Sequence, residues 1–448
     1  MPLPWLTRVA ERLPDHSLAL ALDPYRYIAR RCRQLGADAF ETRLLGQRTI
    51  CMSGPRAAQL FYDPQRFQRQ GAAPEPLKST LFGHGAVQGL DGPAHRRRKS
   101  LFMMLVGPAH VAELAALVEA GWARRVAGWG PAPVVLYREA QAVLTEAVCA
   151  WAGVPLADGE RALRTGQLVS LFDDAGSWRH LRARWRRQRA QQWTAGLVRA
   201  VRSGRLAVPA RPDGSPRALA LVAHASDNDG RLLPEKIAAV ELLNVLRPTV
   251  AVSVFIVQAL HALHHHPQWR QPLLAGDAVA SDCFMQEVRR FYPFFPAAVA
   301  RARADFDWGG VRFGAGQRVM LDLYGTNHDP SSWAQPHLFR PQRFLERMPG
   351  LFDFIPQGGG EAALGHRCPG EGLALAVMTA SVRALAALEW SLPRQDLHID
   401  MHRLPALPRS GFVLCDVRQP RPWADTTPGG EEARSPPERV SGPRAIRA

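Results

Sequence analysis

The chain has 448 residues, of which 46% are hydrophobic and 21% charged, a balance typical of a soluble globular protein with a large core. The formal net charge of +16 comes almost entirely from arginine, since Lys78, Lys99 and Lys236 are the only lysines. An arginine-rich composition explains this charge without a nucleic-acid partner, so we predict none. The six cysteines form no CxxC pair and no zinc spacing, which argues against a disulfide framework.

The N-terminal region contains no long apolar run. Its early apolar stretch, residues 18–22, is too short for a membrane span or for the hydrophobic part of a signal peptide. We therefore expect a cytoplasmic protein with no membrane anchor.

The first half of the chain combines a hairpin with helices. Residues 41–52 predict two strands that turn at Gly46, whereas residues 81–92 carry four glycines and predict a loop. The basic run from His95 to Lys99 is expected to open a helix. Apolar spacing predicts further helices over 109–129 and 137–152.

Three other segments predict surface or flexible structure. Residues 179–189 hold six arginines interleaved with aromatic side chains, and a solvated helix face explains them better than a nucleic-acid site. The Pro- and Gly-rich residues 207–216 predict a loop between helices. A strand is expected over 411–418, and residues 419–448 have the composition of a disordered tail. We therefore predict one domain over 1–418.

The segment from Glu241 to Val252 is a long apolar helix interrupted by Arg247 and Pro248. A proline inside a helix removes a hydrogen bond and costs about 3 kcal/mol, so it needs compensation. An arginine in so apolar a run needs an anion as its partner. The alternative is a kinked helix whose arginine reaches the surface.

Two further clusters lie between this helix and residue 345. Glu287 and Arg290 stand three residues apart on one helix face, where they can pair, and residues 339–344 offer further arginines. Taken alone, such a pair is a routine surface ion pair. The histidines at 261 and 264–266 have a spacing that could suit a metal, but beside Pro267 a solvated surface is the better interpretation.

A glycine-rich stretch surrounds Cys368. Residues 354–360 and 364–370 supply backbone that can pack closely against a flat ligand, and an apolar helix is predicted from Leu373. A thiolate at the start of that helix would be stabilised by the helix dipole and by nearby cations, and such a ligand can hold haem iron. The alternative is an ordinary buried cysteine in a turn.

The Glu287–Arg290 pair, a downstream arginine and the cysteine loop follow one another in the order typical of the cytochrome P450 family, which the chain resembles over roughly residues 12–418. The loop departs from the family pattern: Glu361 and Leu364 stand where a Phe and a Gly are usual, and Gly365 comes one place late. This departure resembles the bacterial fatty-acid peroxygenases.

The central helix resembles the same branch. Arg247-Pro248 stands where monooxygenases of the family carry an acidic residue followed by Thr. The resemblance implies a mainly α fold with a small β portion, holding haem b through the Cys368 thiolate. It also implies that hydrogen peroxide hydroxylates a long-chain fatty acid at the α or β carbon without a dedicated redox partner. Arg247 would hold the substrate carboxylate, which would act as the acid–base group.

The resemblance carries over to further positions. The expected substrate-binding residues are Phe82, Gln88, Val169, Phe172 and Phe294, and the expected haem contacts are His95, Lys99, Arg301 and His366. Gln88 favours hydroxylation, because alkene-forming relatives tend to have His there. The alternatives are decarboxylation to a terminal alkene, a reductase-dependent monooxygenase, or a haem-binding sensor without turnover.

Overall fold

The computed structural model describes residues 10–174 and 180–418. The predicted disordered tail, 419–448, lies outside the described residues. The α-helices are Ser17–Leu22 (α2), Tyr27–Leu35 (α3), Pro55–Phe61 (α4), Glu75–Leu77 (α5), Gly92–Met103 (α6), Pro108–Ala127 (α7), Leu136–Ala152 (α8), Arg161–Asp173 (α9), His180–Arg202 (α10), Ala218–Ala223 (α11), Glu235–Ala251 (α12), Ser253–His265 (α13), Arg270–Leu274 (α14), Ala278–Phe291 (α15), Leu323–Asn327 (α16), Arg343–Glu346 (α17) and Glu371–Ala386 (α18).

Short helices of other types and the strands complete the fold. The short helices are Lys78–Phe82 (η1), Val87–Gly89 (η2), Asp158–Glu160 (η3) and Pro267–Trp269 (η4). The strands are Ala39–Leu44 (β1), Gln47–Met52 (β2), Phe67–Gln68 (β3), Val134–Val135 (β4), Ala297–Ala302 (β5), Phe306–Trp308 (β6), Val311–Phe313 (β7), Arg318–Asp322 (β8), Glu389–Ser391 (β9) and Val413–Arg418 (β10).

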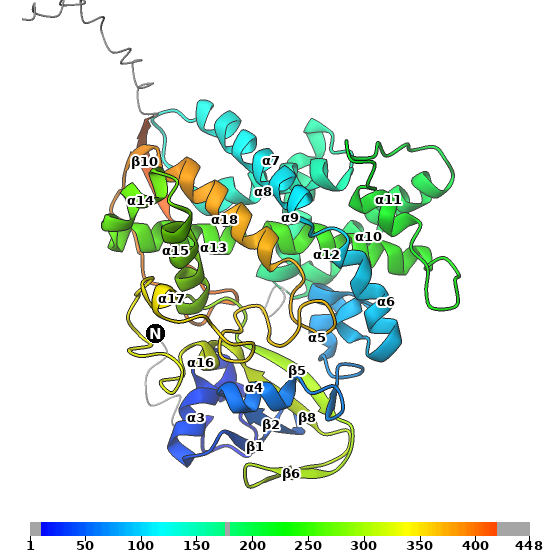
Figure 1. The fold of residues 1–448 in the computed structure, drawn as a ribbon, viewed down its shortest axis with the longest axis vertical. Helices are drawn as coiled ribbons and strands as arrows, with labels where there is room; N and C mark the ends of the chain where they lie inside the picture. The colour runs from blue at the N-terminus through cyan, green and yellow to red at the C-terminus, as the bar shows by residue number, and fades with distance from the viewer. Residues whose placement is uncertain (1–9, 175–179, 419–448) are drawn as a thin grey trace, which may run out of the picture.

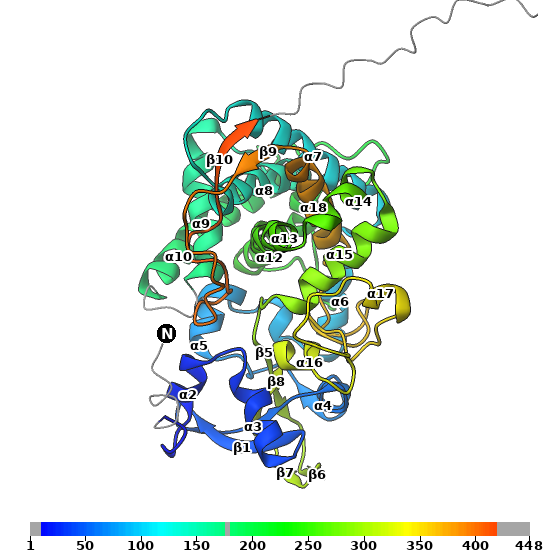
Figure 2. The same cartoon turned by 90° about the vertical axis from the view of Figure 1, so that its left-hand side faces the viewer.

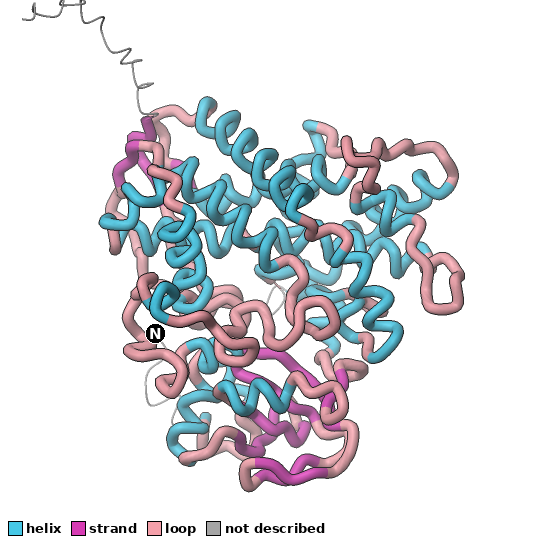
Figure 3. The backbone as a smooth tube through the Cα atoms, in the orientation of Figure 1, coloured by secondary structure: helices cyan, strands magenta, loops and turns pink. Residues whose placement is uncertain are grey.

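The helices and most strands occupy different ends of the molecule. Figure 1 shows β1, β2, β5 and β8 at the lower end with α3 and α4, and the long helices above them. Coloured by secondary structure, Figure 3 shows the same separation, with one small group of strands at the upper end. In Figure 2, α12 and α13 are seen end-on, surrounded by the other helices. The architecture is mainly α with a small β part, as predicted.

The main sheet joins distant parts of the chain. Its strand order within the described residues is β1-β2-β8-β5-β3, in which β2 and β8 run parallel and the other neighbours antiparallel. The predicted hairpin is confirmed as β1 and β2. Its turn needs left-handed backbone at Gly46, where φ is 72°. The strand predicted over 411–418 is confirmed as β10.

Local sequence signals explain where several helices begin. α4 and α7 carry proline in their first turn, where its missing N–H is not needed. The Asp277 carboxylate caps α15 by accepting a hydrogen bond from the Ala280 N–H at 2.9 Å. The helices predicted over 109–129 and 137–152 are confirmed as α7 and α8, and 207–216 is a loop.

The prediction of a loop over 81–92 is partly wrong, because η1 ends at Phe82 and η2 lies within the segment. The reason is a long-range contact. Buried Arg187 of α10 donates to the carbonyls of Thr80 at 3.1 Å and Leu81 at 3.4 Å, at the end of η1. Gly83 permits this approach, since a Cβ there would lie 2.1 Å from Arg187 Nη2.

The same contact corrects the prediction for 179–189. Leu181 and Trp185 are exposed on α10, as a solvated face requires, but Arg187 turns inward and is 3% exposed. Residues 175–179 lie outside the described part of the chain. The sequence periodicity predicts that Arg187 lies on a helix, but it cannot show that the side chain contacts η1, about a hundred residues earlier in the chain.

The central helix forms the middle of the core. Pro248 lies within α12, and the Thr249 hydroxyl donates to the Val245 carbonyl at 3.2 Å close to the proline. Among the described helices, the continuous stretch Glu235–His265 is the only single one long and apolar enough to cross a membrane. Its most apolar part is 83% buried inside the fold, which marks it as a core helix.

Candidate active site

Cys368 lies in the loop that leads into α18. Its N–H donates to the Gln357 carbonyl at 3.1 Å, which ties the two glycine-rich stretches together. Cys368 is a free cysteine. Burial, and then the Glu371 carboxylate, raise the pKa of its thiol, whereas the charges of Lys99 and Arg289 lower it. The cysteine is therefore available as a ligand, with cations near its sulfur.

Three of the four predicted haem contacts lie beside this loop. The rings of His95 and His366 are 4.0 Å apart, and His366 Nε2 is 3.7 Å from Asp91 Oδ1. Lys99 Nζ donates to the carbonyls of Gly365 at 2.9 Å and Arg367 at 2.5 Å. Lys99 of α6 therefore holds the backbone on the N-terminal side of the cysteine.

Burial lowers the pKa values of these basic groups below their ordinary values. It lowers the pKa of His95 to about 3 and that of His366 to about 4, so both imidazoles are neutral at pH 7. It also lowers the pKa of Lys99 to about 8. An anionic group at this position would reverse these shifts by favouring the charged forms.

Arg301 and Arg69 complete the basic groups of this region. Arg301 donates to the carbonyls of Gly71 at 2.8 Å and Gly316 at 2.6 Å, so its bonds to the chain are with loop backbone. Arg69, which was not predicted from the sequence, is buried and lies 4.1 Å from the Phe61 ring centroid. Its charge lowers the pKa of both His95 and His366, which places it in the same cluster.

Arg247 is buried on α12. Its Nη1 has no hydrogen-bond partner among the described residues. Burial, and then the charge of Arg187, lower the pKa of Arg247 to about 9, whereas Cys368 and Glu241 raise it. The arginine thus lies within electrostatic reach of the Cys368 sulfur, and it forms no ion pair with any carboxylate in the described part of the chain.

Gln88 is held by a chain of buried polar groups. Asn244 Nδ2 donates to Gln88 Oε1 at 3.4 Å and to Glu241 Oε2 at 3.0 Å. The other oxygen of Glu241 accepts from Arg98 at 2.7 Å and from the Val87 N–H at 2.9 Å. Asn244, Glu241 and Arg98 were not predicted as part of the site. An apolar helix with one acid and one amide gives no signal of where those groups point.

The four predicted apolar substrate contacts belong to one cluster. Phe172 and Phe294 are buried in the main apolar core that includes the apolar residues of α12, and Phe82 and Val169 pack against it. Phe294 stacks on Phe255 of α13 with 4.4 Å between ring centroids. Their role as substrate contacts stays a prediction, since this core extends through most of the helical part of the molecule.

The predicted Glu287–Arg290 pair is buried rather than a surface pair. Arg290 donates to both carboxylate oxygens at 2.7 and 2.8 Å, and Arg343 Nε lies 3.2 Å from the same carboxylate. Arg343 is therefore the downstream arginine of the motif. The side chain of Arg340 pairs with Glu346 instead.

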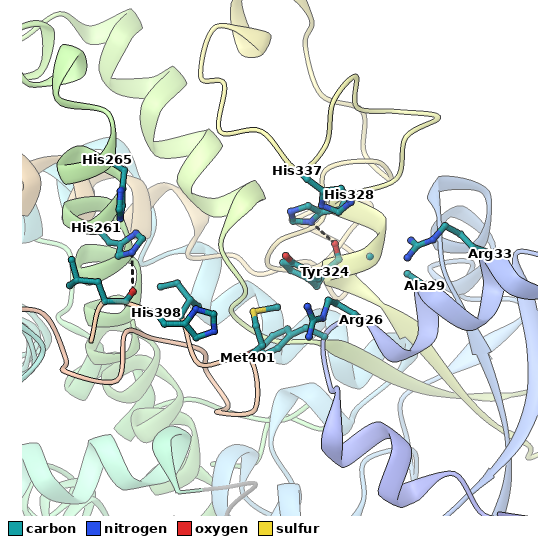
Figure 4. Close-up of a pocket in the computed structure, with 14 residues that line it drawn as sticks. Arg26, Ala29, Arg33, His261, His265, Tyr324, His328, His337, His398 and Met401 are labelled. Carbon is teal, nitrogen blue, oxygen red and sulfur yellow. Dashed lines mark hydrogen bonds between the residues drawn. The ribbon is translucent and has the colours of Figure 1, made fainter. Parts of the chain in front are cut away.

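The histidines at 261–266 do not form a solvated cluster throughout. His261 Nε2 donates to the Leu397 carbonyl at 3.1 Å, and its Nδ1 bonds to Tyr292 Oη at 2.7 Å. The same residue lines a cavity of about 670 Å³ with His265, His328, His337 and His398 (Figure 4). No group of three metal-ligating side chains with metal-binding geometry is present among the described residues. None of the predicted active-site residues lines this cavity.

The residues around Cys368 fit a haem. They combine a free thiol with the basic side chains of His95, Lys99, Arg69 and His366 near its loop. On α12 they add a buried arginine whose Nη1 has no partner among the described residues. An anionic macrocycle would add negative charge beside these basic groups and favour their charged forms. The thiolate is the ligand type that haem iron takes in this kind of site.

Comparison with known proteins agrees with this. The family model "Cytochrome P450" matches residues 282–415. Three solved structures each have a TM-score of 0.87 with this chain. Cytochrome P450SP alpha (CYP152B1) in complex with (R)-ibuprophen is 49% identical, and the match covers 91% of this chain and 99% of that one. Cytochrome P450EX alpha (CYP152N1) with myristic acid is 41% identical, with 91% of this chain and 98% of that one covered. Ligand-free cytochrome P450 OleT is 31% identical, with 92% of this chain and 99% of that one covered.

Putative cytochrome P450 138 of Mycobacterium tuberculosis is 25% identical over 82% of this chain and 86% of its own length, whereas other curated relatives match over shorter stretches. Cytochromes P450 from Arabidopsis thaliana and Mentha piperita are 29–36% identical, but the chain covers only 22–27% of their length. The solved structures, by contrast, are covered almost completely. With its free cysteine, its buried Glu-x-x-Arg cluster and these relatives, the chain belongs to the cytochrome P450 family of haem-thiolate oxidoreductases, in the fatty-acid peroxygenase branch.

Proposed function

We propose that this protein uses hydrogen peroxide to hydroxylate long-chain fatty acids at the α or β carbon. The observation that carries the proposal is Arg247, a buried guanidinium whose Nη1 has no partner in the described part of the chain. A planar guanidinium binds a carboxylate through two parallel hydrogen bonds. A fatty acid would supply that anion and bury its chain among apolar side chains.

The bound carboxylate would also serve as the acid–base group. α12 offers no acidic residue beside Thr249, since Pro248 occupies that place and the Thr249 hydroxyl donates to the Val245 carbonyl. A carboxylate fixed by Arg247 can take a proton from peroxide and return it to the leaving oxygen. The substrate thus completes the catalytic groups.

The remaining residues would hold the cofactor and the acyl chain. Haem iron with a thiolate ligand supplies cleavage of the peroxide O–O bond and oxygen transfer. Cys368 would be that ligand, and His95, Arg69 and His366 would face the propionates. Phe82, Val169, Phe172 and Phe294 would exclude water from the substrate chain.

The main alternative is decarboxylation to a terminal alkene. The Gln88 amide, held by Asn244, favours hydroxylation, because a neutral amide does not titrate near the reacting carbons as a histidine would. A reductase-dependent monooxygenase would need its own proton-delivering acid, and a sensor would not need the arginine. We therefore propose long-chain fatty acid and peroxide as partners, with no dedicated redox protein, in the cytoplasm.

The test uses purified, haem-loaded protein with peroxide and no reductase. A free fatty acid should be hydroxylated, whereas its methyl ester should react poorly, because it offers neither the anion nor the base. Arg247→Ala should lose this activity, and Thr249→Val on the same helix should retain it. A short carboxylic acid should restore oxidation of a small non-acid substrate only while Arg247 is present. Equal turnover of acid and ester would show that substrate-assisted catalysis is wrong.

A further inference from the structure

One residue binds Cys368 in two ways. The Gln357 carbonyl accepts the Cys368 N–H at 3.1 Å, and Gln357 Nε2 lies 3.8 Å from the Cys368 sulfur as a donor. The larger radius of sulfur makes this a hydrogen-bonding distance. Gln357 comes from the first glycine-rich stretch, eleven residues before the cysteine. Its backbone sets the position of the cysteine, and its side chain reaches the sulfur.

A neighbouring arginine fixes the direction of this amide. A glutamine amide can present either its oxygen or its NH2 group, and only the second can donate to sulfur. Arg289 Nε donates to Gln357 Oε1 at 3.1 Å. An arginine has no acceptor, so it can bind only the oxygen end of the amide. The NH2 group is thereby directed at Cys368.

Arg289 is itself held in place. Its side chain is 1% exposed, its Nη2 lies 2.9 Å from a Glu371 carboxylate oxygen, and its Nη1 donates to Gln286 Oε1 at 2.7 Å. Glu371 also binds Arg367, at 2.9 and 3.0 Å. The Glu371 carboxylate and the Gln286 amide thus hold the guanidinium in the position from which it binds the Gln357 amide. The cation also polarises the amide and strengthens its N–H as a donor.

We propose that Gln357 is a positioning residue that withdraws electron density from the Cys368 sulfur, and that Arg289 sets the direction of its amide. The inference rests on the proposed function only in taking Cys368 as the haem ligand. A hydrogen bond to a thiolate weakens its donation to iron, and such outer contacts set reduction potentials. Weaker donation disfavours the ferric state relative to the ferrous one.

The test measures the ferric/ferrous potential of the haem-loaded protein by spectroelectrochemical titration. Gln357→Met removes the donor at similar side-chain size. It should move the potential to more negative values and raise the ferric-to-ferrous ratio at a fixed potential on the order of tenfold, which is about 59 mV for one electron. Gln357→Glu has the same length, can still bind Arg289, and cannot donate when ionised, so it should shift the potential in the same direction.

Gln258→Met is the matched control. Gln258 is buried and donates to the carbonyls of Pro293 and Ala406, both at 2.9 Å, so its loss should leave the potential unchanged. If Gln357→Met does not bind haem, the reduction potential of Gln357→Glu decides the test. Wild-type potentials in the Gln357 variants would overturn the inference. A wild-type ferrous–CO complex without the red-shifted Soret band would instead refute the ligand assignment.

Discussion

Two buried arginines have opposite surroundings. Arg290 binds both oxygens of Glu287 and donates to the carbonyls of Asn327 at 3.0 Å and Pro336 at 2.9 Å. Arg247 has an Nη1 with no partner among the described residues. The first guanidinium is satisfied within the chain and stabilises the packing around α15. The second has a nitrogen that no described residue satisfies, and this difference is the basis for proposing that Arg290 is structural and that Arg247 binds a ligand.

The energetics of the two sites differ in the same way. Removing one partner of a buried ion pair leaves the other charge without compensation and lowers the free energy of unfolding by about 3–5 kcal/mol. A buried arginine without an anion already carries that kind of cost in the free protein. Replacing it should therefore spare the fold and abolish binding.

The largest expected effect follows from the satisfied site. Glu287→Ala would leave Arg290 and Arg343 without their shared carboxylate, so the free energy of unfolding should fall by about 3–5 kcal/mol. Denaturant unfolding measures this. Glu235→Ala is the control, because Arg199, its partner, is exposed and solvent screens the pair, so its loss should change the free energy of unfolding little. Equal losses in the two variants would contradict the comparison.

The unsatisfied site gives the next effect. Arg247→Met should leave the free energy of unfolding of the free protein unchanged or higher. A fatty acid at one hundred times its Kd should stabilise the wild type by about 2.7 kcal/mol, and the variant should gain none of this. Unfolding curves with and without the acid measure both quantities. Fatty-acid stabilisation of Arg247→Met would remove Arg247 from the binding site.

The sequence predicted the residues whose pattern is local. Arg247 stands out because a charge and a proline interrupt an apolar helix, and the Glu287–Arg290 spacing gives a pair on one face. The hairpin at Gly46 is likewise encoded by its turn. The resemblance to the cytochrome P450 family, which rests on these local patterns and the Cys368 loop, then predicted the fold.

The sequence could not predict contacts that depend on tertiary packing. Arg187 looks like its exposed neighbours on α10, and only the folded chain shows that it reaches η1. Arg69 follows a two-residue strand with no signal of its own. His261 belongs to a run of histidines that periodicity alone leaves at the surface. Such residues become distinct only when distant elements meet.

The surroundings of Arg290 also give a pH effect. His328 is buried, its Nδ1 bonds to the Tyr324 carbonyl at 2.9 Å, and burial, followed by the charge of Arg290, lowers its pKa to about 3. The unfolded chain, with an ordinary pKa of about 6.5, binds more protons, so stability rises with pH between these values and is lost as pH falls.

His328→Phe tests this with a ring that does not titrate. Between about pH 6.5 and pH 3, the slope of the free energy of unfolding against pH should fall by up to about 1.4 kcal/mol per pH unit. The wild type should therefore lose about 2 kcal/mol more stability than the variant between pH 6.5 and pH 5. Exposed His264→Gln serves as the control. An unchanged slope in His328→Phe would show that His328 is not buried as a neutral group.

The smallest expected effect concerns Gln88, which belongs to the proposed substrate site with Arg247. The amide accepts a hydrogen bond from Asn244, which Glu241 holds in turn, so its position is set by the same helix that carries Arg247. Gln88→His would place a titratable ring there. We expect it to shift the ratio of hydroxylated to alkene product towards alkene by about fivefold, since one hydrogen bond is worth about 1 kcal/mol.

Asn244→Leu sharpens the test because it frees Gln88 without replacing it. If the held amide sets the reaction outcome, this variant should alter the ratio by less than Gln88→His but measurably. Products are compared at matched turnover, so that a slower enzyme is not mistaken for a different one. A ratio that stays constant in both variants would exclude Gln88 from the region where the α and β carbons react. The buried Asn244–Glu241 network would then stabilise α12 alone.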